Sequence, residues 1–137
     1  MISVTSVTGN YILQPSLIEK HRKTLAWMSA TVHWQREFNF FQKLLDQYAP
    51  RVIEVDGKKR IGHFQSLIVY YRDELIIDLR KKLRDHEIRL ADMLKTKDEL
   101  KTQYFREHDV TMLELEAFDA SFVEFKNEFF EFIEGIM

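Results

Sequence analysis

Apolar residues near the end of the chain recur at the spacing of a coiled-coil helix. Between positions 115 and 136 they are separated alternately by three and four residues. This repeat keeps one edge of a helix against its neighbours. The residues on this edge are Leu115, Phe118, Phe122, Phe125, Phe129, Phe132 and Ile136. After Thr111 the polar positions carry seven carboxylates and one cation, so the pattern predicts an amphipathic helix with a phenylalanine face and an acidic face.

The first long helix is predicted from Ser16 to Tyr48. Ser16 and Glu19 form a capping box, in which each side chain satisfies a backbone N–H at the start of the helix. Pro50 stops the helix, and residues 49–60, which also contain a glycine, are predicted to form a loop. The apolar positions of this helix are Leu17, Leu25, Met28, Val32, Phe38, Phe41, Leu45 and Tyr48.

The second helix is predicted to begin near Gly62 and to end at residues 95–98, where its apolar stripe lapses. In two alternatives, it continues to His108, or a further turn near Asp85 makes a four-helix up-down bundle. The division at 95–98 gives three helices of similar length, so we expect an all-α fold, an antiparallel bundle of three long helices. The apolar positions of the second helix are Phe64, Ile68, Tyr71, Leu75, Leu79, Leu83, Leu90 and Met93.

Size and composition indicate a single helical domain over residues 1–137. Residues 1–15 are rich in β-branched and hydroxylated side chains, and we expect a flexible N-terminal arm there. The sequence has no cysteine, no signal-peptide pattern and no apolar run of the roughly 18 residues that a membrane span needs. We therefore expect a cytoplasmic protein without a membrane partner. The net charge of −2 argues against a nucleic-acid partner.

Short stretches of the sequence resemble a group of small uncharacterised helical-bundle proteins of bacteria, chiefly Bacteroidetes. These stretches are His63-Phe64-Gln65, His86-Glu87, and Tyr104-Phe105 followed by His108 and the phenylalanine repeat. The likeness covers most of the chain after the start of the first helix, and it is closest in the final 33 residues. It implies an all-helical bundle and brings no assigned activity. In those relatives the turn before the last helix tends to contain proline, whereas residues 95–102 contain none.

Three histidines, His21, His86 and His108, occupy positions on the apolar edges of the predicted helices. Counting residues from the two predicted turns places all three within about one helical turn of one another. Three imidazoles with acidic residues nearby are ligands suited to a Zn or Fe site. The alternative is a buried polar layer, in which the imidazoles hydrogen-bond to one another, to threonines or to water. The chain has no His-x-x-x-His and no Glu-x-x-His pair, so the pattern favours the layer.

The second helix also contains a basic cluster. One hypothesis is that it binds phosphate groups of a nucleic acid or an anionic lipid surface. No aromatic residues alternate with it to stack on bases, and the last helix offers many carboxylates. Charge pairing inside the bundle or across an oligomer contact is therefore the favoured interpretation. The cluster consists of Arg80, Lys81, Lys82 and Arg84.

Large aromatic residues outside the apolar edges indicate a second buried surface, although they are also consistent with a wider core. The candidate contact residues are Trp27, Trp34, Phe40 and Phe130. The sequence has no arrangement of a nucleophile beside an acid–base pair, and no glycine loop that would hold a phosphate. We therefore predict a non-enzymatic bundle that binds another copy of itself, as a homodimer or other homo-oligomer, or another helical protein.

Overall fold

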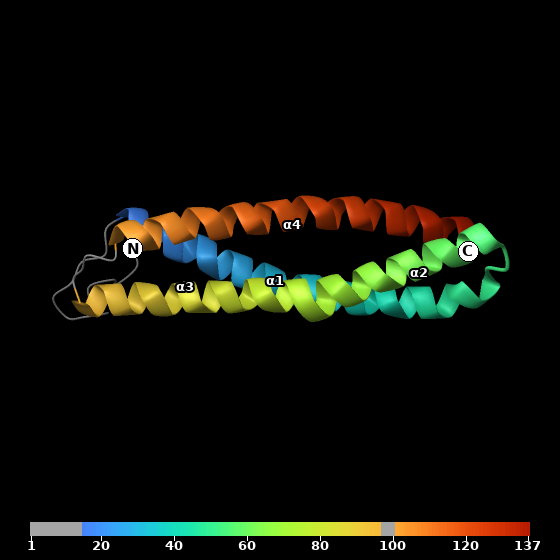
Figure 1. Cartoon of the computed structure of the whole chain (residues 1–137), viewed down its shortest axis with the longest axis horizontal. Helices are drawn as coiled ribbons and strands as arrows, with labels where there is room; N and C mark the ends of the chain where they lie inside the picture. The colour runs from blue at the N-terminus through green and yellow to red at the C-terminus, as the bar shows by residue number, and fades with distance from the viewer. Residues whose placement is uncertain (1–14, 97–100) are drawn as a thin grey trace.

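Three long helical rods lie side by side in the computed structural model, which describes residues 15–96 and 101–137 (Figure 1). The first rod is α1 (Pro15–Tyr48), which ends in the 3-10 turn η2 (Ala49–Arg51). The second rod consists of α2 (Val55–Tyr70), the π-helical segment η3 (Tyr71–Leu75) and α3 (Ile76–Thr96). The third rod is α4 (Lys101–Ile136). The second rod runs opposite to the other two, and the described residues contain no strand, so the predicted three-helix bundle is confirmed.

The start of the second rod differs from the prediction. It begins at Val55 rather than near Gly62, because Glu54 has the extended backbone of an N-cap residue and the chain is helical from the next position. Gly57 therefore lies in the first turn of α2 and not in a loop. A Cβ atom on Gly57 would lie 2.5 Å from Val52 Cγ1, so the glycine leaves room for the connection to fold back over the helix.

The other helix ends agree with the prediction in part. Ser16 is not an N-cap residue, because α1 already includes Pro15, and proline suits the first helical position. The predicted break before the last helix is confirmed, since α3 ends at Thr96 and α4 begins at Lys101. The alternatives with a continuous helix to His108 or a turn near Asp85 are wrong. The arm predicted for residues 1–15 falls almost entirely outside the described residues.

The π-helical segment η3 corrects the register of the second rod. Four apolar residues of the predicted edge, Tyr71, Leu75, Leu79 and Leu83, are spaced by four residues three times in succession. In a regular α-helix each such step turns the apolar edge by about 40°, so the edge would drift away from the core. The Ile76 N–H donates instead to the Tyr71 carbonyl, five residues back. This wider turn absorbs one residue, so Phe64 before it and Leu79 after it are both buried.

The core edge of α1 also differs from the predicted one. Leu25 and Val32 are 47% and 43% exposed, whereas Thr24 and Thr31 are fully buried. The buried edge repeats every seven residues, and these two threonines occupy it in place of larger apolar side chains. Their burial costs little because each hydroxyl donates to a carbonyl of its own helix, Thr24 Oγ1 to Lys20 O at 2.9 Å and Thr31 Oγ1 to Met28 O at 2.6 Å.

Phenylalanine rings from all three rods form the centre of the core. Phe38 of α1 lies 5.2 Å from Phe122 and 5.3 Å from Phe125 of α4, measured between ring centroids. Phe64 of α2 reaches Phe129 in an edge-on contact at 5.4 Å. Such tilted and edge-on pairs are the favoured aromatic geometries, so the predicted phenylalanine edge of α4 is confirmed as the main core face. At the end of this edge the prediction differs, because Ile133 is buried and Ile136 only partly so. Within the described residues, none of the helices combines the length and apolarity needed to cross a membrane.

Candidate functional site

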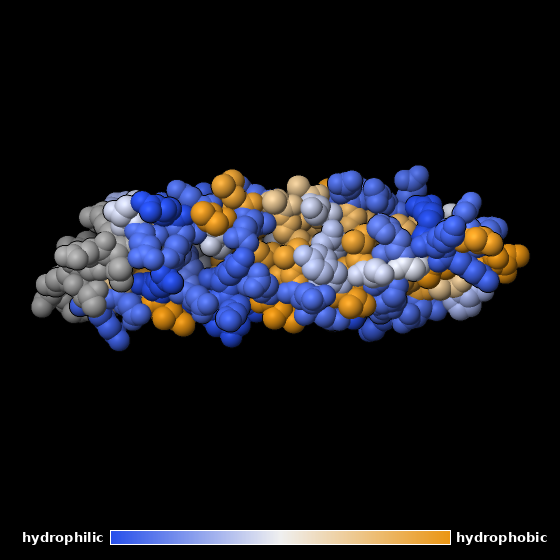
Figure 2. Space-filling view, in the orientation of Figure 1, coloured by the Kyte–Doolittle hydropathy of each residue, from blue (hydrophilic) through white to orange (hydrophobic). Residues whose placement is uncertain are grey.

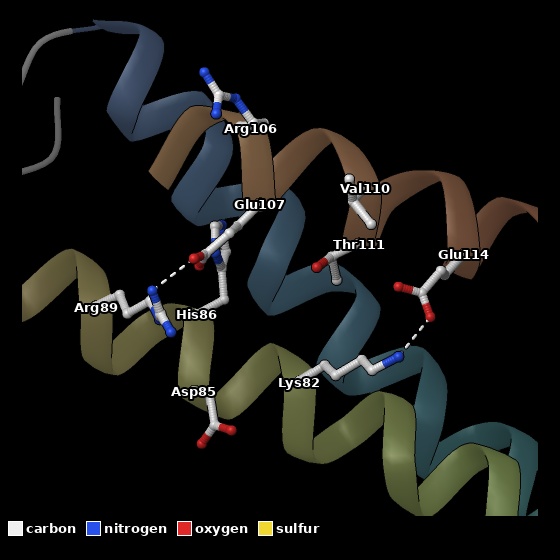
Figure 3. A pocket seen from close by; sticks show the side chains of 9 residues that line it. All are labelled: Lys82, Asp85, His86, Arg89, Arg106, Glu107, Val110, Thr111 and Glu114. Carbon is white, nitrogen blue, oxygen red and sulfur yellow. Dashed lines mark hydrogen bonds and ion pairs between the residues drawn. The ribbon is translucent and has the colours of Figure 1, made fainter. Parts of the chain in front are cut away.

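A groove of about 400 Å³ lies between α3 and α4 near one end of the bundle (Figure 3). Two ion pairs cross it: Lys82 Nζ lies 2.7 Å from Glu114 Oε2, and Arg89 Nη1 contacts Glu107 Oε1. Val110 lies between these pairs with half of its surface exposed. In both pairs the cation belongs to α3 and the carboxylate to α4. Each pair contributes little to the stability of the fold because it is partly exposed. Together, the pairs give the two sides of the groove opposite charge.

The groove continues toward the middle of the molecule with apolar walls. Leu75 and Leu79 line it on the second rod, and Phe118 lines it on α4. Glu114 lines both sections, so the two are contiguous. On α4 the small side chains of Ala117 and Ser121 stand where larger ones would close the gap. In the view of Figure 2, apolar side chains are visible in the middle of this face, and others lie at its right-hand end.

A buried pair of histidines, one from α3 and one from α4, lies at the polar end of the groove. His86 Nε2 and His108 Nδ1 are 2.9 Å apart, and the two residues are 3% and 4% exposed. Tyr104 stacks on the His86 ring with 4.2 Å between ring centroids and an angle of 6° between the planes. His86 lines the groove between α3 and α4, while His108 lines a second groove, between α1 and α4. The pair therefore connects two grooves through the bundle.

The surroundings of both imidazoles favour the neutral form. Burial lowers the pKa of His86 to about 4, with smaller contributions from His108 and Arg89. Burial also lowers the pKa of His108, helped by the positive charge of Lys20 and opposed by Asp109. In the neutral pair the N–H of one ring donates a hydrogen bond to the bare nitrogen of the other, and a second proton between the two nitrogens would abolish this bond. Burial likewise raises the pKa of the Tyr104 hydroxyl.

His21 does not join the histidine pair. Its Nδ1 atom lies 2.8 Å from Glu87 Oε2, in an ion-pair contact that lacks hydrogen-bond alignment. The predicted polar layer is therefore present in part: His86 and His108 bond to each other, and His21 lies at its edge. Among the residues that the structure describes, no three His, Cys, Asp or Glu side chains are placed to hold a metal ion. The Zn or Fe site at His21, His86 and His108 stays a prediction that this geometry does not favour.

The basic cluster does not present a single surface. Arg80 is half-buried against α1, where its Nε donates to Thr31 Oγ1 at 3.1 Å and its Nη2 donates to Gln35 Oε1 at 2.6 Å. Lys82 is engaged on the opposite side of α3, with Glu114. Lys81 and Arg84 are exposed. Because consecutive positions point to different sides of a helix, the four cations are divided between two helix contacts and solvent.

The predicted aromatic contact residues mostly belong to the core. Trp34 is 5% exposed and packs edge-on against Phe118 with 4.6 Å between ring centroids. Trp27 and Phe130 are partly buried against the same core. Phe40 is the exception, at 52% exposure. The wider-core interpretation thus accounts for three of the four residues, and of the four only Phe40 is exposed.

Sequence reasoning missed the groove between α3 and α4. Its signal is present in the last helix, where Ala117 and Ser121 lie four residues apart beside the phenylalanine edge. Residues four apart share a helix face, so this pair predicts a shallow strip next to the core. No protein-family model, no curated protein and no solved structure matches this chain.

Proposed function

We propose that this protein is a non-enzymatic helical bundle that acts by self-association through the groove between α3 and α4. The observation that supports this most strongly is the division of charge across the groove. The α3 side carries Lys82 and Arg89, and the α4 side carries Glu107 and Glu114. Asp85 of α3 and Arg106 of α4 also line the groove. In Figure 3 their side chains point away from the space between the two helices, so the four paired residues set the charge at its centre.

The two sides are complementary to those of a second copy. A twofold axis parallel to the bundle places α3 of one copy over α4 of the other, antiparallel and at the same level. Lys82 and Arg89 then face the partner copy's carboxylates, while the apolar middle sections cover each other. The result is an alternating four-helix arrangement, which is a stable way to bury such a seam. The part of η3 and α3 that lines the groove, from Tyr71 to Arg89, is about 25 Å long.

A charge-exchange experiment tests the proposal. One variant carries Lys82→Glu and Arg89→Glu, which makes both sides of the groove acidic. The other carries Glu107→Lys and Glu114→Lys, which makes both sides basic. Each variant alone is expected to be monomeric, because like charges face each other across the axis. An equimolar mixture is expected to form a heterodimer, because every facing pair is again of opposite sign.

Controls separate association from folding. Both variants lose the same two internal ion pairs, so equal melting temperatures show that a difference in association does not come from unfolding. The variant with all four substitutions restores the internal pairs, and it is expected to bind itself but not the original chain. The proposal is overturned if the acidic and basic variants each associate as tightly as the original chain, or if their mixture does not associate.

A further inference from the structure

The core of this bundle is divided in two by a layer of polar side chains. The larger cluster holds seventeen buried residues of the described chain, including Leu83 and Met112. A smaller cluster at the end where α3 stops and α4 starts holds five. The five are Leu17, Leu90, Met93, Leu94 and Tyr104.

The dividing layer draws one or two residues from each rod. It contains four of the five buried polar side chains that the structure describes. In sequence each lies between a residue of one cluster and a residue of the other: His86, for example, lies between Leu83 and Leu90. Among the buried residues that the structure describes, no apolar contact joins the two clusters. The layer consists of Thr24, His86, His108 and Thr111.

The layer and its surroundings are incompletely hydrogen-bonded. Four buried side-chain atoms in the described residues have no hydrogen-bond partner, and all four belong to residues at this level. They are His86 Nδ1, Tyr104 Oη, His21 Nδ1 and Glu87 Oε1. Buried polar atoms without partners reduce the free energy gained by closing the structure around them. The attachment of the small cluster to the large one is therefore weak.

We infer that residues 15–24, 86–96 and 101–111 form an end unit that opens locally while the rest of the bundle stays folded. The layer is the boundary along which the unit separates, because opening there breaks few apolar contacts and exposes to water the buried polar atoms that lack a hydrogen-bond partner. Arg89 and Glu107 belong to the end unit, so opening dismantles the polar half of the groove. Local opening of the end unit does not depend on self-association through the groove.

Hydrogen exchange of backbone amides, followed by mass spectrometry or NMR, tests the inference on the full chain. Amides of the end unit are expected to exchange at least about tenfold faster than those of residues 34–45, 64–83 and 115–133. Their exchange is also expected to depend more weakly on urea, because local opening exposes less surface than global unfolding. Uniform protection, or an equally steep dependence on urea, would overturn the inference.

A double variant tests the role of the layer. His86→Leu with His108→Leu joins the two clusters into one apolar core, and the difference in protection is expected to disappear. The matched control, His33→Leu with His63→Leu, replaces two exposed histidines and is expected to leave the difference unchanged. A difference that persists in the first variant would show that the layer is not the boundary. If that variant does not fold, the urea dependence in the original chain decides.

Discussion

His86 and His108 share one hydrogen bond inside the bundle, with 2.9 Å between Nε2 of the first and Nδ1 of the second. Each residue is more than nine-tenths buried, and Tyr104 covers the His86 ring. Such a pair holds the two helices in one register, because a shift of either helix separates the nitrogens. It also couples the stability of the bundle to protons, because the bond requires one of the two nitrogens to be unprotonated.

The bundle is predicted to lose stability as the pH falls below about 6.5. In the folded chain the pKa of His86 is about 4 and that of His108 is also lowered. Between pH 6.5 and 4 the unfolded chain therefore binds protons that the folded chain does not, so the free energy of unfolding decreases with falling pH. The loss from His86 alone is of order 3 kcal/mol near pH 4. Urea denaturation at several pH values measures it.

The double variant His86→Leu with His108→Leu serves as the reference for that experiment. It keeps every carboxylate, so the difference between the two stability curves isolates the contribution of the pair. Above pH 7 the two stability curves are expected to have the same slope. A difference that stays constant from pH 7 to pH 4.5 would contradict the lowered pKa values.

Replacing one histidine of the pair is predicted to lower the free energy of unfolding by more than the loss of that side chain's packing contacts. His108→Leu leaves His86 Nε2 buried without a partner, at a cost of about 1–3 kcal/mol. The same holds for His86→Leu and the Nδ1 atom of His108. The double variant removes both polar groups together, so it is expected to be less destabilised than the sum of the single variants. A double-mutant cycle in urea measures this coupling, and additive effects would argue against a direct bond.

Trp34 is predicted to be important for stability, whereas Phe40 is predicted to tolerate substitution. Trp34→Ala removes a 5%-exposed side chain from the aromatic core and is expected to cost about 3–5 kcal/mol. Phe40→Ala removes a half-exposed ring and is expected to change stability by about 0.5 kcal/mol or less at concentrations where the chain is monomeric. Similar costs for both variants, measured by thermal or urea denaturation, would contradict the assigned burial.

Two glycines of α2 are predicted to respond differently to alanine. Gly62→Ala meets no atom within 4 Å and is expected to stabilise the chain by about 0.5–1 kcal/mol, because alanine favours helix interiors. Gly57→Ala places its Cβ 2.5 Å from Val52 Cγ1, so that side chain or the connection must move. It is expected to destabilise the chain relative to Gly62→Ala. Equal melting temperatures for the two variants would show that Val52 does not fold over α2.

The sequence predicts most of the bundle because one helix has an unambiguous pattern. The phenylalanine edge of α4 is a regular heptad repeat, so its burial follows directly. Other apolar residues of that helix, such as Leu113 and Val123, do not continue a repeat of this kind and are exposed. In α1 the pattern was ambiguous: Leu25 and Val32 are more apolar than Thr24 and Thr31, yet the threonines are buried. Register against the other rods decides which edge is inside, and a single helix does not contain that information.

The histidine pair and the groove were predictable to different extents. Counting from the turns correctly brought His86 and His108 to one level, because rise per residue is constant in a helix. It did not give the direction of each side chain, and His21 turns to Glu87 instead. The π-helical segment was readable from the repeated four-residue spacing between Tyr71 and Leu83. The groove depends on how far α3 and α4 stand apart, which follows from packing of the whole core.

The most direct test of the central proposal is sedimentation equilibrium of the untagged full chain. Concentrations from about 1 to 100 μM cover the range of moderate affinities. Self-association through the groove predicts a mass that rises with concentration toward twice 16.5 kDa, and a Lys82→Glu, Arg89→Glu variant that stays at the monomer mass. A mass of 16.5 kDa throughout this range, or a variant that associates as the original chain does, would contradict the proposal.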